Sequence, residues 1–468
     1  MPITSIHSFP MMPTSGFTAL LERYDRPGPR YTSYPTIDQC GESEGPQAYY
    51  QALQSRVVGG LQRPLSLYVH VPFCASVCYF CACNKVITKK HDQVADYLNC
   101  LEKEARWVAQ SGTAMTPVVQ FHMGGGTPTF LTDHELKDLV ERLEKIFPFA
   151  KHAERSIEVD PRTVNKERLG SLRGMGFNRI SFGVQDFDPL VQKAVHREQS
   201  FESVESLVAA ARALGFESVN VDMIYGLPHQ STGTFARTLD QLIALSPDRI
   251  ALYGYAHMPE RFKPQRRIHI DDLPDAEARL DILSLAIDKL QAAGFDYIGM
   301  DHFAKPSDAL SKARRQGVLH RNFQGYTTQP DADLIGLGVS AISRIGPTLI
   351  QNSRNLEEYQ YSVNKQGSAV FRGHVSDRDD LIRQTVIMAI LCQGELEFAD
   401  FLETHWVDFQ EYFSRELDSL SEFVEDGLLI WDDVGIRLTE RGWFFVRPIA
   451  MCFDRYVRKS GLQGSQVL

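Results

Sequence analysis

The sequence lacks an apolar stretch long enough to cross a membrane. A transmembrane helix needs about 18 to 20 consecutive apolar residues, and the runs VIMAILC (386–392) and LIGLGVSAI (334–342) are far shorter. The N-terminus has no basic region followed by an apolar segment, so no signal peptide is predicted. We therefore expect a protein without a membrane span, located in the cytoplasm.

Positive charge is scarce as well. The 49 Lys and Arg residues are outnumbered by 59 Asp and Glu residues, which gives a net charge of -10. Nucleic-acid binding favours a basic surface, so we expect no nucleic-acid partner. A local basic pocket could still hold an anionic small molecule. The 468 residues, 43% of them hydrophobic, are typical of a globular chain, with roughly two or three domains.

Cysteine is sparse outside one stretch, YVHVPFCASVCYFCACN (68–84). Half of the eight cysteines lie within it, namely Cys74, Cys78, Cys81 and Cys83. The others occur singly, at Cys40, Cys100, Cys392 and Cys452. In a reducing compartment, such a cluster indicates metal or redox chemistry more than disulfides.

The cluster lacks the second half that a zinc site needs. Its spacing is C-x3-C-x2-C-x-C, and neither a second CxxC nor paired histidines at finger spacing occur. Ferredoxin-type runs use another spacing and a remote cysteine before proline. Three cysteines at this spacing can instead hold three irons of a [4Fe–4S] cube and leave the fourth iron free for a substrate. Cys83 is the ambiguous member of the group.

Short apolar and β-branched runs alternate with helical patterns from residue 65 onward. The predicted strands are 65–71, 118–123, 156–160, 179–184, 218–226 and 249–257. The predicted helices are 92–108, 132–146, 163–175, 201–214, 232–245 and 274–293. This alternation predicts a parallel sheet with right-handed helical crossovers, barrel-like or open, and a site at the C-terminal ends of its strands.

The predicted strand ends carry glycine or polar residues. In MGGGTPTF (123–130), three glycines would let backbone N–H groups approach a carboxylate or phosphate. Polar side chains end the later strands: Glu158, Gln185, Asp186, Asp222 and His257. Any one of these could be only a helix cap, but so many in successive strands favour a binding site. Arg197 could pair with a carboxylate bidentately.

The N-terminal segment YDRPGPRYTSYPT (24–36) is limited by proline to extended and turn conformations. It is either a plain surface arm or an arm that offers Arg23, Arg26 and Arg30 to an anion. Because most loops are only connections, the residues alone favour the plain arm.

The chain after residue 295 departs from the regular alternation. Residues 297–306 predict one more strand, and 319–343 are expected to line or cover a site. Helices at 377–391, 397–404 and 407–424, with a hairpin at 428–439 turning at Asp432 to Gly435, predict a small winged-helix-like domain. Its many carboxylates would repel DNA, so we interpret it as a structural or covering domain.

Several motifs together resemble a known family. Cys74-x3-Cys78-x2-Cys81 after a first strand, a GGGTP loop after the second and EVDP in the third resemble the radical S-adenosylmethionine (SAM) enzymes. The chain is more narrowly similar to the oxygen-independent coproporphyrinogen III oxidases. This similarity runs through PGPRYTSYPT, LYVHVPFC, CYFCAC, GGGTPTF, IEVDPR, FNRISFGVQDF, VDMIYGLP, GMDHFAKP, HRNFQGYTTQ and PIAMCFD.

The resemblance implies an α/β fold with a partial (β/α)6 TIM-like barrel of the radical SAM type. It also implies an N-terminal covering arm (1–60), a catalytic domain (61–370) and a mainly helical, winged-helix-like C-terminal domain (371–468). Cys74, Cys78 and Cys81 would ligate a [4Fe–4S] cluster, and SAM would chelate the open iron. Reductive cleavage of SAM would give a 5′-deoxyadenosyl radical that takes a hydrogen from a propionate of coproporphyrinogen III. Loss of CO2 and an electron would leave a vinyl group, and two rounds would give protoporphyrinogen IX.

The resemblance also assigns site residues. One SAM would contact Tyr68, Gly125, Glu158, Ala256 and Ile342. A second SAM would contact Phe80, Gly126, Thr127, Gln185, Arg197 and Asp222. Cys83, Tyr68 and His70 would take part in the reaction, with Cys83 near the second SAM and not a cluster ligand. The substrate carboxylates would be held by arginines such as Arg30, Arg266, Arg267 or Arg321.

The expected partners are coproporphyrinogen III, an electron donor and an electron acceptor, and the protein is expected to be a monomer. The sequence leaves three alternatives. A related haem-binding chaperone would lack the fourth cysteine and the GPRYTSYP arm, both of which are present here. The second alternative is a radical SAM enzyme with another substrate. The third is a zinc-binding interaction protein, which the missing second ligand pair disfavours.

Overall fold

The computed structural model describes residues 14–42, 45–56, 63–329, 332–460 and 466. Parts of the expected arm and C-terminal domain, such as 1–13 and 461–465, lie outside the described residues. Within the described residues, no helix combines the length and apolar character that spanning a bilayer requires.

A sheet of twelve strands forms the centre of the molecule, and its six predicted parallel strands are all present. They are β1 (Leu65–Val71), β4 (Val118–Gly125), β5 (Phe149–Val159), β6 (Arg179–Gln185), β7 (Ser218–Tyr225) and β8 (Arg249–Gly254). They lie side by side in chain order. A sheet wound in one direction in this way curls like a TIM barrel. It ends at two edge strands, so the barrel is partial, as expected.

The predicted crossover helices are also present. They are α3 (Val94–Gln110), α4 (Asp133–Ile146), α5 (Lys166–Gly174), α7 (Phe201–Ala213), α8 (Thr232–Leu245) and α9 (Ala276–Ala292), with a short α6 (Pro189–Ala194) added. In β6, the apolar Ile180, Phe182 and Val184 are buried while their neighbours in between are only half-buried. Because strand side chains alternate between faces, the apolar set packs under the helices and the polar set faces the barrel interior.

Further strands, beyond the six predicted parallel ones, extend both edges of the sheet. One edge adds β13 (Asp333–Leu337), β14 (Ile342–Ile345), β15 (Thr348–Asn352) and β16 (Val370–Val375). The other adds β10 (His302–Ala304) and β9 (Asp296–Gly299). The prediction of a single strand at 297–306 is therefore wrong. Gly299 (φ 140°) and Met300 (φ 50°) reverse the chain there, and β9 and β10 pair antiparallel.

The predicted cover at 319–343 contains no helix in its described part. It begins with a hairpin of β11 (His320–Asn322) and β12 (Gly325–Thr327), which places Gln324 and Tyr326 against a cavity in the barrel. Helix α10 (Ala309–Arg315) precedes it, and α11 (Leu356–Gln366) follows β15. The remaining small strands, β2 (Phe73–Cys74) and β3 (Val86–Ile87), pair with each other.

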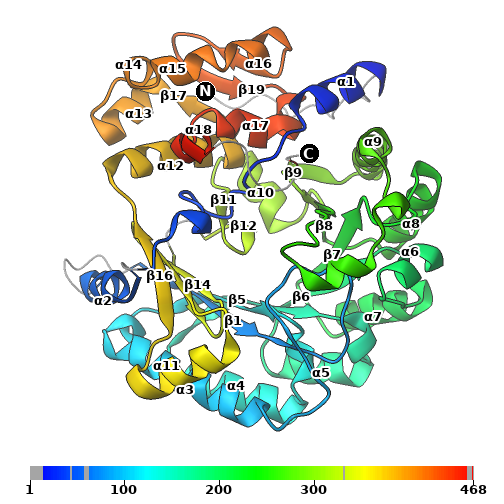
Figure 1. Cartoon of the computed structure of the whole chain (residues 1–468), viewed down its shortest axis with the longest axis vertical. Coiled ribbons are helices and arrows are strands. Elements are labelled where there is room, and N and C mark those ends of the chain that lie inside the picture. Colours follow the sequence, from blue (N-terminus) through cyan, green and yellow to red (C-terminus); the bar gives the residue numbers. More distant parts are fainter. Residues whose placement is uncertain (1–13, 43–44, 57–62, 330–331, 461–465, 467–468) are drawn as a thin grey trace.

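The C-terminal helices pack on α12 (Arg378–Cys392) as a separate layer above the barrel (Figure 1). They are α13 (Phe398–His405), α14 (Phe409–Tyr412), α15 (Ser414–Asp418), α16 (Ser421–Glu425), α17 (Val446–Met451) and α18 (Arg455–Ser460). The predicted hairpin is present as β18 (Leu429–Trp431) and β19 (Gly435–Leu438), joined by β17 (Glu395–Glu397). The single helix expected at 407–424 is instead three short ones. Phe409 and Phe413 both pack on Phe453 there, and this tertiary packing outweighs the helical periodicity.

Because β16 belongs to the large sheet, we propose that the catalytic domain extends to residue 375 and that the C-terminal domain begins at 376. The arm domain contains α1 (Thr14–Tyr24) and α2 (Gly45–Ser55). Figure 1 shows the chain between these helices, in blue, running between the C-terminal layer and the sheet.

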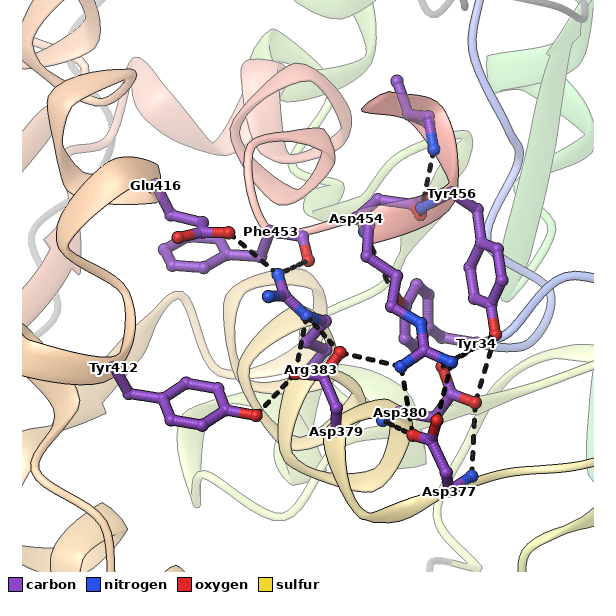
Figure 2. Close-up of polar contacts among 12 residues, drawn as sticks. Tyr34, Asp377, Asp379, Asp380, Arg383, Tyr412, Glu416, Phe453, Asp454 and Tyr456 are labelled. Atoms are coloured by element: carbon purple, nitrogen blue, oxygen red, sulfur yellow. Dashed lines mark hydrogen bonds and ion pairs between the residues drawn. The ribbon is translucent and has the colours of Figure 1, made fainter. Parts of the chain in front are cut away.

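A network of ion pairs connects the C-terminal segment to α12 (Figure 2). Arg455 lies 2.9 Å from Asp377, 2.8 Å from Asp379 and 3.1 Å from Asp380. The Tyr456 hydroxyl donates to Asp380 at 2.9 Å. His374 of β16 lies 3.0 Å from the same carboxylate, so the network also reaches the edge of the large sheet.

The expectation of a plain surface arm is wrong. Tyr31 and Tyr34 are each only 1% exposed, and the Tyr31 hydroxyl donates to Asp454 at 2.9 Å. Arg30 donates to the Gly254 carbonyl at 3.0 Å, at the end of β8. The proline-rich sequence predicted the extended backbone, but the partners that bury it come from distant parts of the chain.

Candidate functional site

A cavity of about 370 Å³ opens at the C-terminal ends of the parallel strands. All four clustered cysteines line it. So do most of the predicted cofactor residues: Phe80, Gly125, Gly126, Thr127, Glu158, Gln185, Arg197 and Asp222. Residues that are up to 148 positions apart in the chain, from Cys74 to Asp222, meet here because parallel strands end at one edge.

Each cysteine sulfur has a different environment. Cys74 ends β2, and its sulfur lies 3.4 Å from the Thr127 hydroxyl. The sulfur of Cys78 accepts from Arg197 at 3.3 Å and from Arg162 at 3.5 Å. Cys81 and Cys83 lie beside each other, and Lys85 donates to both of their backbone carbonyls.

The surroundings of the Cys81 thiol lower its pKa and so favour the thiolate. The hydrogen bond from Cys83, opposed by burial and assisted by the charge of Lys85, lowers the pKa of Cys81 to about 6. The same contact and the negative charge on Cys81 raise the pKa of Cys83. Burial raises the pKa of Cys74 to about 11. Because iron ligands are thiolates, the donor set suits an iron–sulfur cluster, and Cys83 stays protonated beside a ligand.

The arrangement does not suit zinc. Across the described ranges, no three His, Cys, Asp or Glu side chains converge as the ligands of one metal ion. The cysteine ligands of a cube bind different irons, so their sulfurs lie further apart than four ligands around a single zinc. The described side chains therefore offer no preformed set of ligands for a single zinc ion.

The N–H groups of the glycine loop were predicted to approach a ligand's carboxylate or phosphate, but they bind groups of the protein itself. The N–H groups of Gly126 and Thr127 donate to the carbonyls of Val71 and Phe73, and that of Gly125 donates to Glu158 at 3.1 Å. These N–H groups are therefore used within the protein. Glycine is required because a Cβ on Gly125 would lie 2.6 Å from the His70 ring, at a φ of 118°.

Glu158 is held as an anion. Burial raises its pKa, but the hydrogen bond and charge of His122 and the N–H of Gly125 outweigh burial and lower it. His122 lies 3.2 Å from Glu158 and 2.5 Å from the Ser156 hydroxyl. A carboxylate that lines the cavity can accept hydrogen bonds from a ligand's hydroxyl or amino groups.

Tyr68 and His70 form a buried pair on β1. Burial lowers the pKa of His70, so its ring is neutral. Its Nε2 lies 2.9 Å from the Asn84 carbonyl, which can only accept, so Nε2 carries the proton. Nδ1 then accepts from the Tyr68 hydroxyl at 3.1 Å. The pair thus ties β1 to Asn84, directly after Cys83.

Asp222 and Gln185 end two further strands at the cavity. Asp222 accepts from Asn220 at 2.7 Å and from Ser181 at 3.0 Å. Burial and the charge of Glu158 raise its pKa to about 6. Gln185 has a φ of 76°, a strained backbone for a residue with a Cβ, and such strain is concentrated at functional sites.

Some predicted residues lie elsewhere. Asp186 is buried behind the strand, where it accepts from Thr238 at 2.7 Å, and His257 pairs with the Tyr255 hydroxyl outside the first cavity. Ile342 is buried in a small apolar cluster with Cys40 and Leu349. Ala256 lines a second, neighbouring cavity.

The second cavity has a volume of about 860 Å³ and lies beneath the arm. It shares Phe80, Cys81, Cys83 and Tyr253 with the first cavity, so the two meet at the cysteine loop. Its size is at the upper end of ordinary ligand pockets. Tyr456, which belongs to the ion-pair network of Figure 2, also lines it.

Two arginines, Arg30 and Arg261, line this second cavity. Sequence reasoning missed Arg261, whose only signal was its position shortly after a strand end. Arg266 and Arg267 point elsewhere, to the Pro259 carbonyl and the Tyr79 hydroxyl. Arg321 lies against the Tyr326 ring and donates to the Tyr31 carbonyl at 3.2 Å. Arg23 and Arg26 contact the C-terminal domain, at Asp426 and the Pro448 carbonyl.

Comparisons with known proteins agree with this geometry. The family model of the Radical SAM superfamily matches residues 68–242, and that of the HemN C-terminal domain matches residues 376–445. Oxygen-independent coproporphyrinogen III oxidases of Pseudomonas aeruginosa and Escherichia coli are 48% and 47% identical to the chain. Each match covers 94% of this chain and 95% of the relative.

A solved structure, titled coproporphyrinogen III oxidase (HemN) from Escherichia coli is a Radical SAM enzyme, superposes with a TM-score of 0.89. It is 45% identical and covers 94% of this chain and 98% of its own. Identity at this level over nearly the full length of both chains establishes the family. The chain belongs to the oxygen-independent coproporphyrinogen III oxidases, within the radical SAM superfamily.

Proposed function

We propose that the first cavity holds a [4Fe–4S] cluster with SAM and that the second holds the porphyrinogen. The proposed reaction is the oxygen-independent oxidative decarboxylation of two propionates of coproporphyrinogen III to vinyl groups, giving protoporphyrinogen IX. The observation that carries the proposal is the junction of the two cavities at Phe80, Cys81, Cys83 and Tyr253. When bound, the cluster and SAM supply a carbon radical that removes a hydrogen atom from the propionate β-carbon.

The electron balance of the reaction shows which redox partners the enzyme needs. Each propionate loses one hydrogen atom, CO2 and one electron to become a vinyl group. The reaction therefore needs an external electron donor and an external electron acceptor. The enzyme is proposed to act as a monomer. No proton need be lost from a protein side chain in this step, so we assign the residues to binding, orientation and water exclusion.

Cys74, Cys78 and Cys81 are the proposed cluster ligands. The lowered pKa of Cys81 supports a thiolate there, and the two arginine contacts place positive charge beside the Cys78 sulfur. Cys83 is proposed to hold its proton beside Cys81, at the boundary with the substrate cavity.

The other chain groups are proposed to hold SAM. The Glu158 carboxylate would accept hydrogen bonds from one SAM molecule, and the Gly125 backbone, which holds Glu158, would line the same site. Tyr68 and His70 would fix strand β1 beside it. Gly126, Thr127, Gln185, Arg197 and Asp222 would contact a second molecule in the same cavity. Phe80 would separate both from the substrate.

The substrate carboxylates are proposed to meet Arg30 and Arg261. Burial and the neighbouring charges of Arg261 and Arg372 lower the pKa of Arg354. Cations therefore gather at this edge of an otherwise acidic protein, where a porphyrinogen with four propionates would bind favourably.

Anaerobic turnover tests the proposal. Protein reconstituted with iron and sulfide, given SAM, a reductant and coproporphyrinogen III, is expected to form protoporphyrinogen IX and 5′-deoxyadenosine. Cleavage of SAM without any change in the porphyrinogen would contradict the substrate assignment. Cys78→Ser is expected to abolish the visible absorption of the cluster and Cys83→Ser to preserve it, so loss in the second variant would make Cys83 a ligand.

A further inference from the structure

Two arginines and one aspartate enclose the sulfur of Cys78. Asp160, the residue after β5, accepts from Arg162 through Nε at 3.0 Å and through Nη2 at 2.7 Å. The same carboxylate lies 3.2 Å from Nη1 of Arg197. Both guanidinium groups then reach the Cys78 sulfur, at 3.5 Å for Arg162 and 3.3 Å for Arg197. We call these three residues the Cys78 clasp.

The clasp is built to hold its shape. The side chains of Asp160 and Arg197 are about nine-tenths buried, and that of Arg162 is 23% exposed. Arg197 is fixed further by the Gly183 carbonyl, which accepts from its Nε at 3.1 Å. A two-point contact between a guanidinium and a carboxylate fixes both distance and orientation. The N–H groups directed at the sulfur are therefore preorganised.

The other two proposed ligands have different neighbours. Cys74 meets the neutral hydroxyl of Thr127, and Cys81 meets the thiol of Cys83. Lys85 donates to the backbone carbonyl of Cys81. Among the described residues, Cys78 is the proposed ligand whose sulfur accepts from two guanidinium groups, whereas the Lys85 ammonium acts on the Cys81 thiol.

We propose that Arg162 is a positioning residue that tunes the reduction potential of the cluster through Cys78. Hydrogen bonds and positive charge at a ligand sulfur stabilise the more negative, reduced state of an iron–sulfur cluster and so raise its potential. The clasp would make the one-electron reduction that precedes SAM cleavage easier for the external donor. This inference rests on the proposed role of Cys78 as a cluster ligand.

Arg162 is the informative member of the clasp. Arg197 lines the first cavity, where it is also proposed to contact SAM. Arg162 approaches the sulfur from outside that cavity, because the described lining includes Cys78, Asp160 and Arg197 but not Arg162. A change at Arg162 can therefore act on the cluster without removing a SAM contact.

The test is a mediated redox titration of the full-length reconstituted protein, followed by visible absorption and EPR, with neither SAM nor porphyrinogen present. In Arg162→Gln the cluster is expected to be about tenfold harder to reduce, which for a one-electron couple is a fall of about 59 mV. Arg162→Lys keeps the charge and loses the two-point contact, so a smaller fall is expected. Arg168→Gln is the matched control, since Arg168 is 22% exposed, pairs with Asp133 and lies on the neighbouring α5.

A wild-type potential in Arg162→Gln would overturn the inference. If that variant fails to hold a cluster, the test rests on Arg162→Lys. A lower potential in Arg162→Lys would support the inference, and an unchanged potential would overturn it. A shift of equal size in Arg168→Gln would also overturn it, because the effect would then be general. Failure of the ligand assignment gives a different result, namely a cluster that persists in Cys78→Ser.

Discussion

At the scale of single residues, the sequence does not reveal which arginines line the second cavity and which contact the protein backbone. Arg261 and Arg266 are five positions apart in the chain, yet of these two only Arg261 lines the second cavity. Arg266 instead donates to the Pro259 carbonyl at 3.1 Å. Both side chains are exposed, so composition and burial alone do not separate them.

Arg261→Gln is expected to weaken substrate binding. Loss of an exposed charge contact costs about 1 kcal/mol, so the KM for coproporphyrinogen III should rise about fivefold, with the cluster content unchanged. Steady-state anaerobic kinetics measure this change. Arg266→Gln is the control, and an equal rise of KM in the control would refute a specific role for Arg261.

Glu104 on α3 is a buried carboxyl group outside the cavity. It accepts from Gly338 N at 2.8 Å, Asn352 at 2.6 Å and Tyr359 at 2.7 Å. Burial outweighs these donors and raises its pKa from 4.5 to about 7. Through Gly338 it holds the turn between β13 and β14, beside the first strand of the barrel.

This pKa predicts a pH-dependent stability. Between pH 4.5 and pH 7 the folded protein retains a proton at Glu104 that the unfolded chain has lost, so stability falls as pH rises. Glu104→Gln cannot titrate. The unfolding free energy of the wild type relative to this variant should therefore fall by about 3 kcal/mol across that window. Urea unfolding at both pH values measures it, and a constant difference would contradict the prediction.

At the scale of elements, the end of β4 shows how one backbone conformation fixes the site. Gly125 adopts a φ of 118° and lies against the His70 ring of β1. Its N–H binds Glu158 at the end of β5. One glycine therefore sets the spacing of three neighbouring strand ends, which is where the proposed SAM contacts lie.

Gly125→Ala is expected to displace His70 and to strain the backbone by about 1 to 3 kcal/mol. The SAM affinity should fall, since the displaced backbone N–H of residue 125 no longer meets Glu158, and isothermal titration with SAM measures this. Gly174→Ala is the control, because a Cβ there meets nothing within 4 Å. Unchanged SAM binding in Gly125→Ala would show that the strand ends are not coupled in this way.

At the scale of the whole molecule, the arm connects the two domains. Tyr24 stacks on Phe423 of the C-terminal domain with ring centroids 4.5 Å apart. Further along, Arg30 donates to the end of β8. The arm therefore lines the second cavity, and it also contacts the C-terminal domain.

Tyr31→Phe is expected to loosen the arm. The change leaves the buried Asp454 carboxylate without one of its donors, at a cost of about 1 to 3 kcal/mol. Faster hydrogen exchange is expected in residues 24–36, together with a higher KM for the porphyrinogen. Tyr50→Phe, at a hydroxyl-bearing ring that is 54% exposed, is the control. Wild-type exchange in the arm of Tyr31→Phe would refute the role of this contact.

The sequence by itself determined the local features of this protein. Alternating apolar runs predicted the six parallel strands and their helices, because each pattern reports which face a regular element buries. The cysteine spacing predicted the cluster loop, since its members are neighbours along the chain. Strand ends such as Glu158 and Asp222 could be assigned to one edge for the same local reason.

The tertiary structure alone decided what depends on partners from distant positions. The burial of Tyr31 depends on Asp454, and the environment of Cys78 depends on Arg162 and Arg197. The breaks at Met300 and Phe413 follow from packing that no local period contains. Local patterns record the preference of each segment, whereas these contacts exist only after the segments have come together, and this is why the sequence could not reveal them.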